Sequence, residues 1–184
     1  SYEPGTARLA MMPRFGTELL VSRSLSNISW YGRGPIETYW DRQFEPIGLY
    51  KSTVAKEWVD YSQPQENGNK TEVRWMSLTN TNGDGLMAIG APYISTSAYL
   101  FPTEDLDEPC VRKSQRHPSD IIEKDMVTWN IDWKQMGVGG DTSWGAYPHQ
   151  QYLIPATRIS YSFRLCPVSK AETAANSIYH QYKP

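Results

Sequence analysis

Cysteine and histidine are scarce in this chain of 184 residues, which holds two of the first and three of the second. Two cysteines, Cys110 and Cys166, are too few for a disulfide scaffold and lack the spacing of metal ligands. We expect both to be free thiols, with a single bridge between them as the alternative. The histidines are scattered, so no metal triad or Ser-His pair can be assembled by spacing from His117, His149 and His180.

Charge of one sign and long apolar runs are also lacking. The formal net charge is -2, and acids and bases are mixed along the chain, so we expect no nucleic-acid partner and no attraction to an anionic membrane. No run of eighteen apolar residues predicts a membrane span, and no secretory signal pattern is visible. The first residue is serine, which is consistent with a chain cut from a longer polypeptide.

Aromatic residues are present in an uneven set. The chain has seven tryptophans and twelve tyrosines but only four phenylalanines. Tryptophan and tyrosine combine an apolar ring with a polar group, which suits a surface that is buried on one side and meets a wet ligand on the other. The composition therefore favours recognition of a neutral ligand that is polar and ring-shaped.

The segment Met136–Trp144 combines three glycines with an acid, two hydroxyls and a terminal indole. Glycine is used where the backbone takes a positive φ or where another group comes close, so Gly137, Gly139 and Gly140 predict a tightly folded loop. Trp144 would lie against the C–H face of a sugar, or it would cap the core as part of a plain hairpin loop. No lysine follows the glycines, so a phosphate-binding loop is not expected.

Short segments with alternating polarity recur along the chain and are joined by Gly and Pro turns. This pattern predicts an all-β, antiparallel β-sandwich rather than alternating strands and helices. Val73 and Trp75 are expected on one face of their strand, and Trp75, Trp129 and Trp133 in the core or between domains. The expected strands cover residues 19–21, 28–31, two pieces within 47–58, 71–78, 86–90, 93–100, 126–133, 152–154 and 159–165, with order beginning near Leu9.

Carboxylates that could cleave a glycosidic bond are few. That reaction needs two carboxyl groups facing one bond, and the spacing of Glu37, Asp41 and Glu66 does not bring any two of them together. We expect these three residues, with Arg42 and Asn67, to hold loops by hydrogen bonds, and Arg42 to bind a carboxylate. On this chemistry the chain is not an enzyme by itself.

Three segments, in this order, resemble the C-terminal domain of large bacterial β-galactosidases of glycoside hydrolase family two. They read WYGRGPIETYWDR (Trp30–Arg42), PQENGNK (Pro64–Lys70) and NID followed by MGVGGDTSW (Asn130–Trp144). The resemblance runs from about Pro13 to Leu165. Each motif alone is moderately specific, and the three in order are highly specific.

The resemblance implies a fold, a partner and a role for the glycine-rich loop. It implies a galactose-mutarotase-like supersandwich that packs on a catalytic barrel of the same polypeptide, whose glutamates hydrolyse terminal β-D-galactose residues with retention. Magnesium and sodium would bind in that barrel, and we expect no cofactor in this chain. Trp144 would contact β-galactosides such as lactose, and the loop would be supported by Gly137, Gly139, Gly140, Asp141 and Ser143.

The resemblance also suggests how the chain is divided. We expect an N-terminal remnant or linker over residues 1–12, the sandwich domain over 13–167, and a tail over 168–184 in which Ala171–Tyr182 forms a helix. Only twelve residues precede Pro13, so we expect an incomplete portion of the sandwich, and a homo-oligomer when the protein is full length. A free-standing carbohydrate-binding module and an architectural or oligomerisation domain are the alternatives.

Overall fold

Antiparallel strands dominate the part of the chain that the structure describes. The structure is a computed structural model, and it describes residues 1–6, 9–62, 64–106, 117–142 and 144–182. Its strands are β1 (Met11–Met12), β2 (Arg14–Ser22), β3 (Asn27–Arg33), β4 (Ile47–Thr53), β5 (Lys70–Thr79), β6 (Gly85–Tyr99), β7 (Met126–Gln135), β8 (Ile154–Pro155) and β9 (Ser162–Val168). The 3-10 helices are η1 (Val54–Glu57), η2 (Thr103–Leu106), η3 (Pro118–Asp120) and η4 (Gln150–Tyr152), and the α-helix is α1 (Ala171–Tyr182).

One large sheet organises the molecule. Its strands lie in the order β2-β7-β6-β5-β3-β4, with β9 joined to β6, while β1 and β8 form a separate two-stranded sheet. The pairings between these strands are antiparallel. The predicted all-β, sandwich-like class is therefore confirmed.

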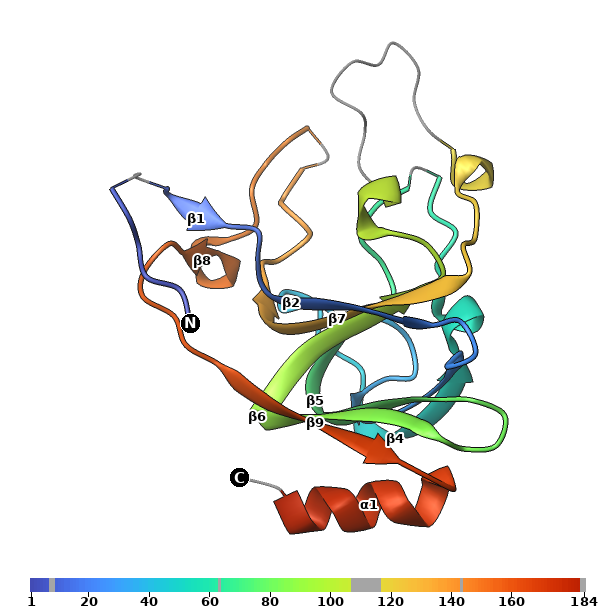
Figure 1. The fold of residues 1–184 in the computed structure, drawn as a ribbon. Helices are drawn as coiled ribbons and strands as arrows, with labels where there is room; N and C mark the ends of the chain where they lie inside the picture. Colours follow the sequence, from blue (N-terminus) through green and yellow to red (C-terminus); the bar gives the residue numbers. More distant parts are fainter. Residues whose placement is uncertain (7–8, 63, 107–116, 143, 183–184) are drawn as a thin grey trace.

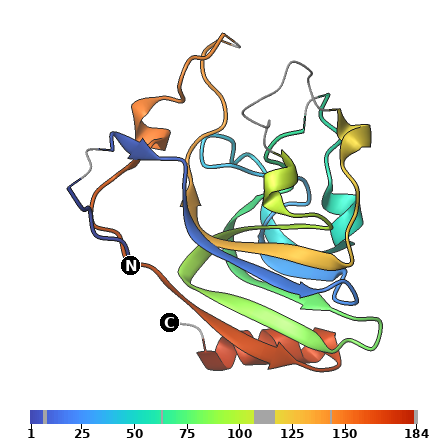
Figure 2. The same cartoon turned by 45° about the horizontal axis from the view of Figure 1, so that its top comes forward.

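Strand β6 changes partner along its length. Gly85–Ala91 pair with β9, and Ser95–Tyr99 pair with β7. Because β5 pairs with β6 across both parts, β7 and β9 share the other edge of β6 and separate from each other between Ala91 and Ser95. Figures 1 and 2 show β9 (red-orange) and β7 (gold) diverging from β6. The two strands predicted over 86–90 and 93–100 are thus a single strand of 15 residues.

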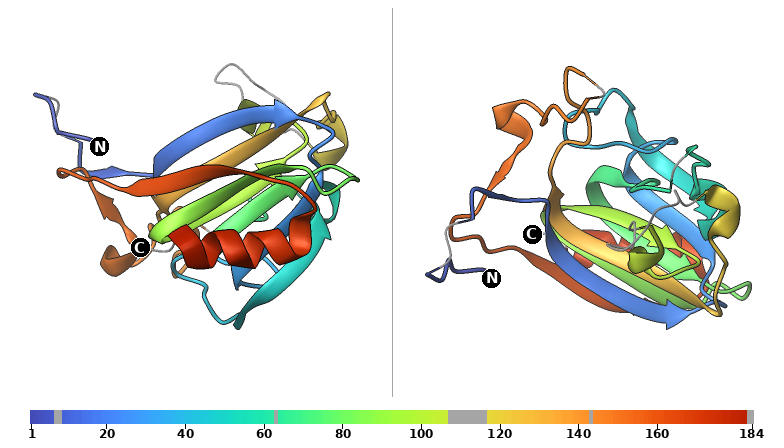
Figure 3. Two further views of the ribbon diagram at one scale, coloured as in Figure 1. Left: turned by 60° about the horizontal axis from the view of Figure 1, so that its bottom comes forward. Right: turned by 90° about the horizontal axis from the view of Figure 1, so that it is seen from above.

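The two faces of the sheet bury different apolar clusters. One face carries the larger cluster, which includes Trp30, Met76 and Trp129. The other face carries Trp75 and Met87, and the residues packed there include Ala175 of α1. Figure 3 shows α1 lying across this second face. The helix predicted over Ala171–Tyr182 is present with those bounds. Packing against the sheet stabilises a helix that would be marginal at this length on its own.

The prediction that Val73 and Trp75 share a face is wrong. Val73 lies in the larger cluster and Trp75 in the cluster under α1. The β5–β6 register shifts between these two residues, and Glu72 nearby has a φ of 50°. Val73 pairs with Ile94 and Trp75 with Ile89, so four residues of β6 lie opposite one residue of β5. Where the pairing is irregular in this way, side chains on either side of the irregularity can face opposite sides of the sheet. Trp75 and Trp129 are buried as expected.

Several smaller expectations also differ from the structure. The second strand piece expected within residues 47–58 is the 3-10 helix η1. Residues 152–154 were expected to form a strand, but only Ile154 belongs to one, because η4 occupies residues 150–152. Order begins before Leu9, since Tyr2 pairs with Ile159.

The division into residues 1–12, 13–167 and 168–184 stays a prediction. Cys166 is buried and free, whereas Cys110 lies outside the described residues.

Candidate functional site

A cleft of about 900 Å³ lies beside the glycine-rich loop that follows β7, and we call it the loop cleft. Much of its lining comes from residues 137–141 and 145–149. The opposite side carries polar groups from three other segments, which are Asp41 with Arg42, Tyr61, and Gln65 with Glu66. Figures 1 and 2 show this loop (orange) projecting from the end of the sheet opposite α1.

Three backbone N–H groups donate hydrogen bonds that fix the first half of the loop. The Met136 N–H donates to the Pro13 carbonyl at 2.9 Å, and the Gly137 N–H donates to the Tyr152 carbonyl at 2.8 Å. The Gly139 N–H donates to Oδ2 of Asp41 at 2.8 Å. Because the three acceptors come from separate segments, the loop base is held on several sides. Asp41 thus holds a loop by a hydrogen bond, as the sequence analysis expected.

The three predicted glycines do not all serve the same purpose. A Cβ on Gly140 would lie 2.2 Å from the Ala146 carbonyl oxygen, and one on Gly137 would lie 2.8 Å from the Asp41 carboxylate. Both positions therefore require a close approach. A Cβ on Gly139 would meet its nearest atom at 3.6 Å, an ordinary contact. The glycine of this loop that has a positive φ is Gly145, at 89°, which the sequence analysis did not select although it directly follows Trp144.

The second half of the loop is closed by a side-chain contact. Oδ1 of Asp141 lies 2.7 Å from Nε2 of His149, and the loop-support role expected of Asp141 stays a prediction. Sequence reasoning missed His149 because the pair is eight residues apart in an irregular segment. The Trp144 N–H donates weakly to the Thr142 hydroxyl at 3.4 Å. Ser143, the remaining predicted support, lies outside the described residues.

Trp144 stands at the tip of this loop with its ring in solvent. The residue is 92% exposed, so the alternative in which it caps the core does not hold. An exposed indole presents an apolar face and one N–H donor. The loop beneath it is anchored, and this combination gives a ring that projects outward from a fixed base.

The segment Glu37–Arg42 contributes Tyr39, Asp41 and Arg42 to the lining of the loop cleft and contains one buried carboxylate, Glu37. Glu37 accepts hydrogen bonds from the Gly68 N–H at 2.7 Å, from the Tyr39 hydroxyl at 3.2 Å, and from Arg42 and Tyr61. The predicted bond from Arg42 to a carboxylate is therefore confirmed. Burial, followed by the charge of Glu37, raises the pKa of Tyr39 well above its usual range, so the phenol remains a neutral donor.

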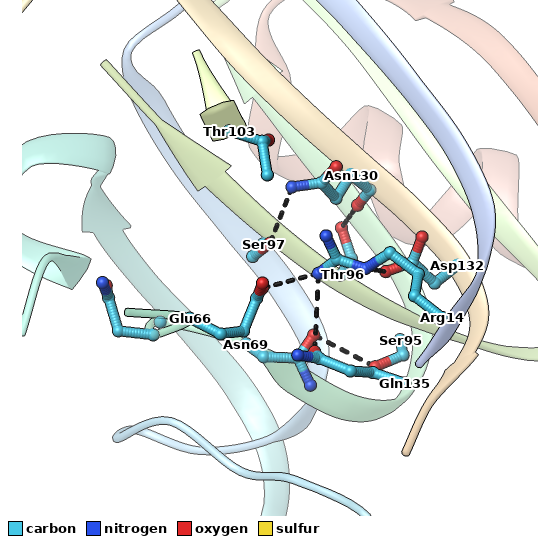
Figure 4. A network of polar contacts seen from close by, with 12 residues as sticks. Arg14, Glu66, Asn69, Ser95, Thr96, Ser97, Thr103, Asn130, Asp132 and Gln135 are labelled. Carbon is cyan, nitrogen blue, oxygen red and sulfur yellow. Dashed lines mark hydrogen bonds and ion pairs between the residues drawn. The ribbon is translucent and has the colours of Figure 1, made fainter. Parts of the chain in front are cut away.

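A second polar network anchors the strand end that leads into the loop. Nη2 of Arg14 lies 2.5 Å from Glu66, and its Nε lies 3.0 Å from Asp132 without hydrogen-bond alignment. The Tyr99 hydroxyl donates to Glu66 at 2.8 Å, and Arg14 also donates to Gln135, the last residue of β7, at 3.5 Å. Burial raises the pKa of Asp132 to about 7, although the Arg14 charge opposes the rise. Figure 4 shows Arg14 between the two carboxylates.

The carboxylates considered for catalysis are engaged elsewhere. Glu37 and Glu66 are hydrogen-bonded within the two networks, and Asp41 holds Gly139. Among the described residues, no three His, Cys, Asp or Glu side chains gather as metal ligands. Within the same part of the chain, no helix is long and apolar enough to cross a membrane.

Comparisons with known proteins identify the family. Residues 2–165 match the family described as the β-galactosidase small chain. A β-galactosidase of Priestia megaterium is 37% identical over 160 residues, which are 85% of this chain and 15% of that protein. Two further β-galactosidases, from Bifidobacterium adolescentis and Streptococcus thermophilus, are each 32% identical to this chain, and the matches cover 80% and 90% of it. The chain spans 14% and 16% of these two relatives. The chain belongs to the β-galactosidase small chain family.

Proposed function

We propose that this chain is the C-terminal domain of a retaining β-galactosidase that hydrolyses terminal β-D-galactose residues. In this proposal the domain packs on a catalytic barrel of the same polypeptide and supplies Trp144 to the sugar site. Family membership supports the proposal, as do curated relatives that are named β-galactosidase. The chain spans about 15% of the first relative, which is consistent with catalytic groups that lie elsewhere in the protein.

The exposed indole on an anchored loop is the observation that carries the proposal. Trp144 is 92% exposed, so its apolar ring contributes no free energy of burial to the fold. A partner or ligand that covers the ring would gain that free energy. The Asp41–Gly139 and Asp141–His149 contacts hold the loop. Fixing a binding loop before the ligand arrives lowers the entropy lost on binding. Stacking on the C–H face of galactose is the role that this geometry suits.

The division of labour follows from the carboxylates. Retaining hydrolysis uses two carboxyl groups about 5 Å apart, one as acid and base and the other as nucleophile. Because Glu37, Asp41 and Glu66 are engaged in structural contacts, we assign binding to this domain and bond cleavage to the barrel. The isolated chain is then inactive. Magnesium and sodium belong to the barrel in the same proposal.

The proposal is tested by replacing Trp144 with alanine in the full-length protein. Loss of a stacking ring should raise KM and lower kcat/KM for lactose by about tenfold or more, equivalent to about 1.4 kcal/mol. Phe44→Ala is the matched control, because Phe44 is also 92% exposed and does not line the loop cleft. We expect the control to keep its kinetics.

Other outcomes separate the alternatives. Unchanged kinetics for Trp144→Ala would exclude a role in the sugar site and would leave an architectural domain. Tight binding of lactose by the isolated chain would favour a carbohydrate-binding module. A shallow site with one aromatic ring should bind with a Kd of about 1 mM or weaker, so we expect little or no binding in calorimetry.

A further inference from the structure

A second cleft, of about 520 Å³, opens where β7 and β9 separate along β6, and we call it the split cleft. Its floor is the part of β6 near Pro92–Ser95. One wall is Trp133–Gln135 at the end of β7, the other is Ser160 with Tyr161 just before β9, and Trp40 joins them from the loop after β3. The two clefts share only Gln135 among their lining residues. A volume of this size is within the range of small-ligand pockets.

Lys134 places an ammonium group in this cleft between two indoles. Its Nζ lies 3.7 Å from the ring centroid of Trp40 and 4.9 Å from that of Trp133. Within the described part of the chain, no carboxylate forms an ion pair with it. Aromatic faces attract a cation and hold it in place, but unlike a carboxylate they do not neutralise its charge. Burial lowers the pKa of Lys134, a penalty on the charged form that a bound anion would offset.

The other charged groups around the split cleft do not neutralise the positive charge of Lys134. Glu72 lines the cleft, but it is paired with Arg33, so the two charges offset each other. Nearby, the guanidinium of Arg74 lies 4.2 Å from the Tyr93 ring centroid, and it donates a hydrogen bond to the backbone carbonyl of Glu72. The surroundings therefore keep a net positive charge beside an aromatic surface.

We propose that the split cleft binds an anionic monosaccharide, meaning a hexose ring that carries one carboxylate or phosphate group. The anion pairs with Nζ of Lys134, and the partly exposed rings of Trp133 and Tyr93 contact the C–H groups of the sugar. The side chains of Gln43 and Ser160, which line the same cleft, supply hydrogen bonds to the hydroxyls. This site is separate from the one proposed for Trp144 and does not depend on it.

The test is calorimetric titration of the full-length polypeptide that contains these residues. The probes are glucuronate, glucose 6-phosphate, neutral glucose, acetate and inorganic phosphate, each added in the presence of a saturating, non-hydrolysable thiogalactoside that occupies the galactose site. We expect saturable binding of an anionic sugar, at least tenfold tighter than that of glucose or of the free anions. Binding of glucuronate would identify a carboxylate as the preferred anion, and binding of glucose 6-phosphate would identify a phosphate.

Variants of Lys134 provide the second measurement. Lys134→Met should weaken binding of the anionic sugar by about tenfold or more, whereas Lys134→Arg should keep it within about threefold because it preserves the charge. Lys56→Met, at an exposed lysine on η1 that does not line the split cleft, should have no effect. The proposal is overturned if glucose or free phosphate binds as tightly as the anionic sugars, if no probe binds, or if Lys134→Met retains full affinity. If Lys134→Met does not fold, loss of binding in Lys134→Arg would also overturn it.

Discussion

Asp132 is a buried carboxyl group whose raised pKa lets it change its protonation state near neutral pH. Burial raises this pKa from 3.8 to about 7, while the Arg14 charge lowers it less strongly. The folded state therefore holds a proton that the unfolded state releases at lower pH. The stability that this proton confers is fully present below pH 3.8 and is lost as the pH rises through about 7.

We predict that the Asp132→Asn variant loses this part of the pH dependence. In the parent chain Asp132 lowers the free energy of unfolding as the pH rises from 4 to 7, by at most about 1.4 kcal/mol per pH unit. Urea denaturation at several pH values measures the slope for both proteins. Asp125→Asn, at an exposed carboxylate close to the start of β7, is the control and should leave the slope unchanged. Equal slopes for Asp132→Asn and the parent would contradict the assignment.

Individual residues of the site were predictable to different degrees. That Arg42 binds a carboxylate was predicted, because an arginine near several acids forms charge-assisted hydrogen bonds, but the partner, Glu37, is known only from the structure. The Asp141–His149 and Arg14–Asp132 contacts were not, since the second joins residues 118 positions apart through the β2–β7 pairing. Contacts that depend on sheet register are fixed by tertiary packing and leave no local signal.

At the level of elements, the glycine-rich loop shows why composition alone does not assign a role to each glycine. The pattern predicted a tight loop, and close approaches at Gly137 and Gly140 account for two of its glycines. Gly139 has neither a close contact nor a positive φ. The two neighbouring glycines thus form a natural pair for substitution.

We predict that Gly140→Ala displaces the loop and that Gly139→Ala does not. The added methyl group would lie 2.2 Å from the Ala146 carbonyl oxygen in the first case and 3.6 Å from Asp41 in the second. Overpacking of this kind costs about 1–3 kcal/mol when the backbone must move. In the full-length protein, kcat/KM for lactose should fall several-fold for Gly140→Ala and remain near the parent value for Gly139→Ala. A similar loss in both variants would show that the close approach is not what requires Gly140.

Strands were predicted well where polarity alternates and poorly where the sheet is irregular. The segments around Trp75 and Trp129 alternate with period two, and both became long central strands. The irregular pairing of β5 with β6 and the change of partner along β6 could not be foreseen, because each depends on which strands lie on either side. The split cleft arises from the second of these features, so no sequence pattern indicated it.

At the scale of the whole molecule, the edges of the large sheet are exposed and apolar. The outer strands are β2 and β4, on which Leu20 is 62% and Leu49 is 59% exposed. Edge strands with apolar side chains pair readily with other chains unless charge or covering elements prevent it. Elements that pack on these strands would cover such edges.

We predict that the isolated chain of 184 residues self-associates and that Leu49→Lys reduces this association. Sedimentation velocity at increasing concentration measures the shift from monomer to larger species. Ile122→Lys is the matched control, because Ile122 is 66% exposed but lies in the loop before β7 rather than on an edge strand. A strictly monomeric parent chain, or equal effects of the two substitutions, would contradict the role of the edge. The homo-oligomer implied for the full-length protein stays a separate prediction.

The most direct measurement of the central claim is a structure of the full-length protein with a bound galactoside. We predict that the Trp144 ring lies against the sugar, with carbon atoms of the two within about 4 Å, which is the distance of apolar contact. The sugar would at the same time contact the glutamates of the barrel. A sugar bound in the barrel with the Trp144 ring pointing to solvent, or packed only on its own domain, would contradict the account.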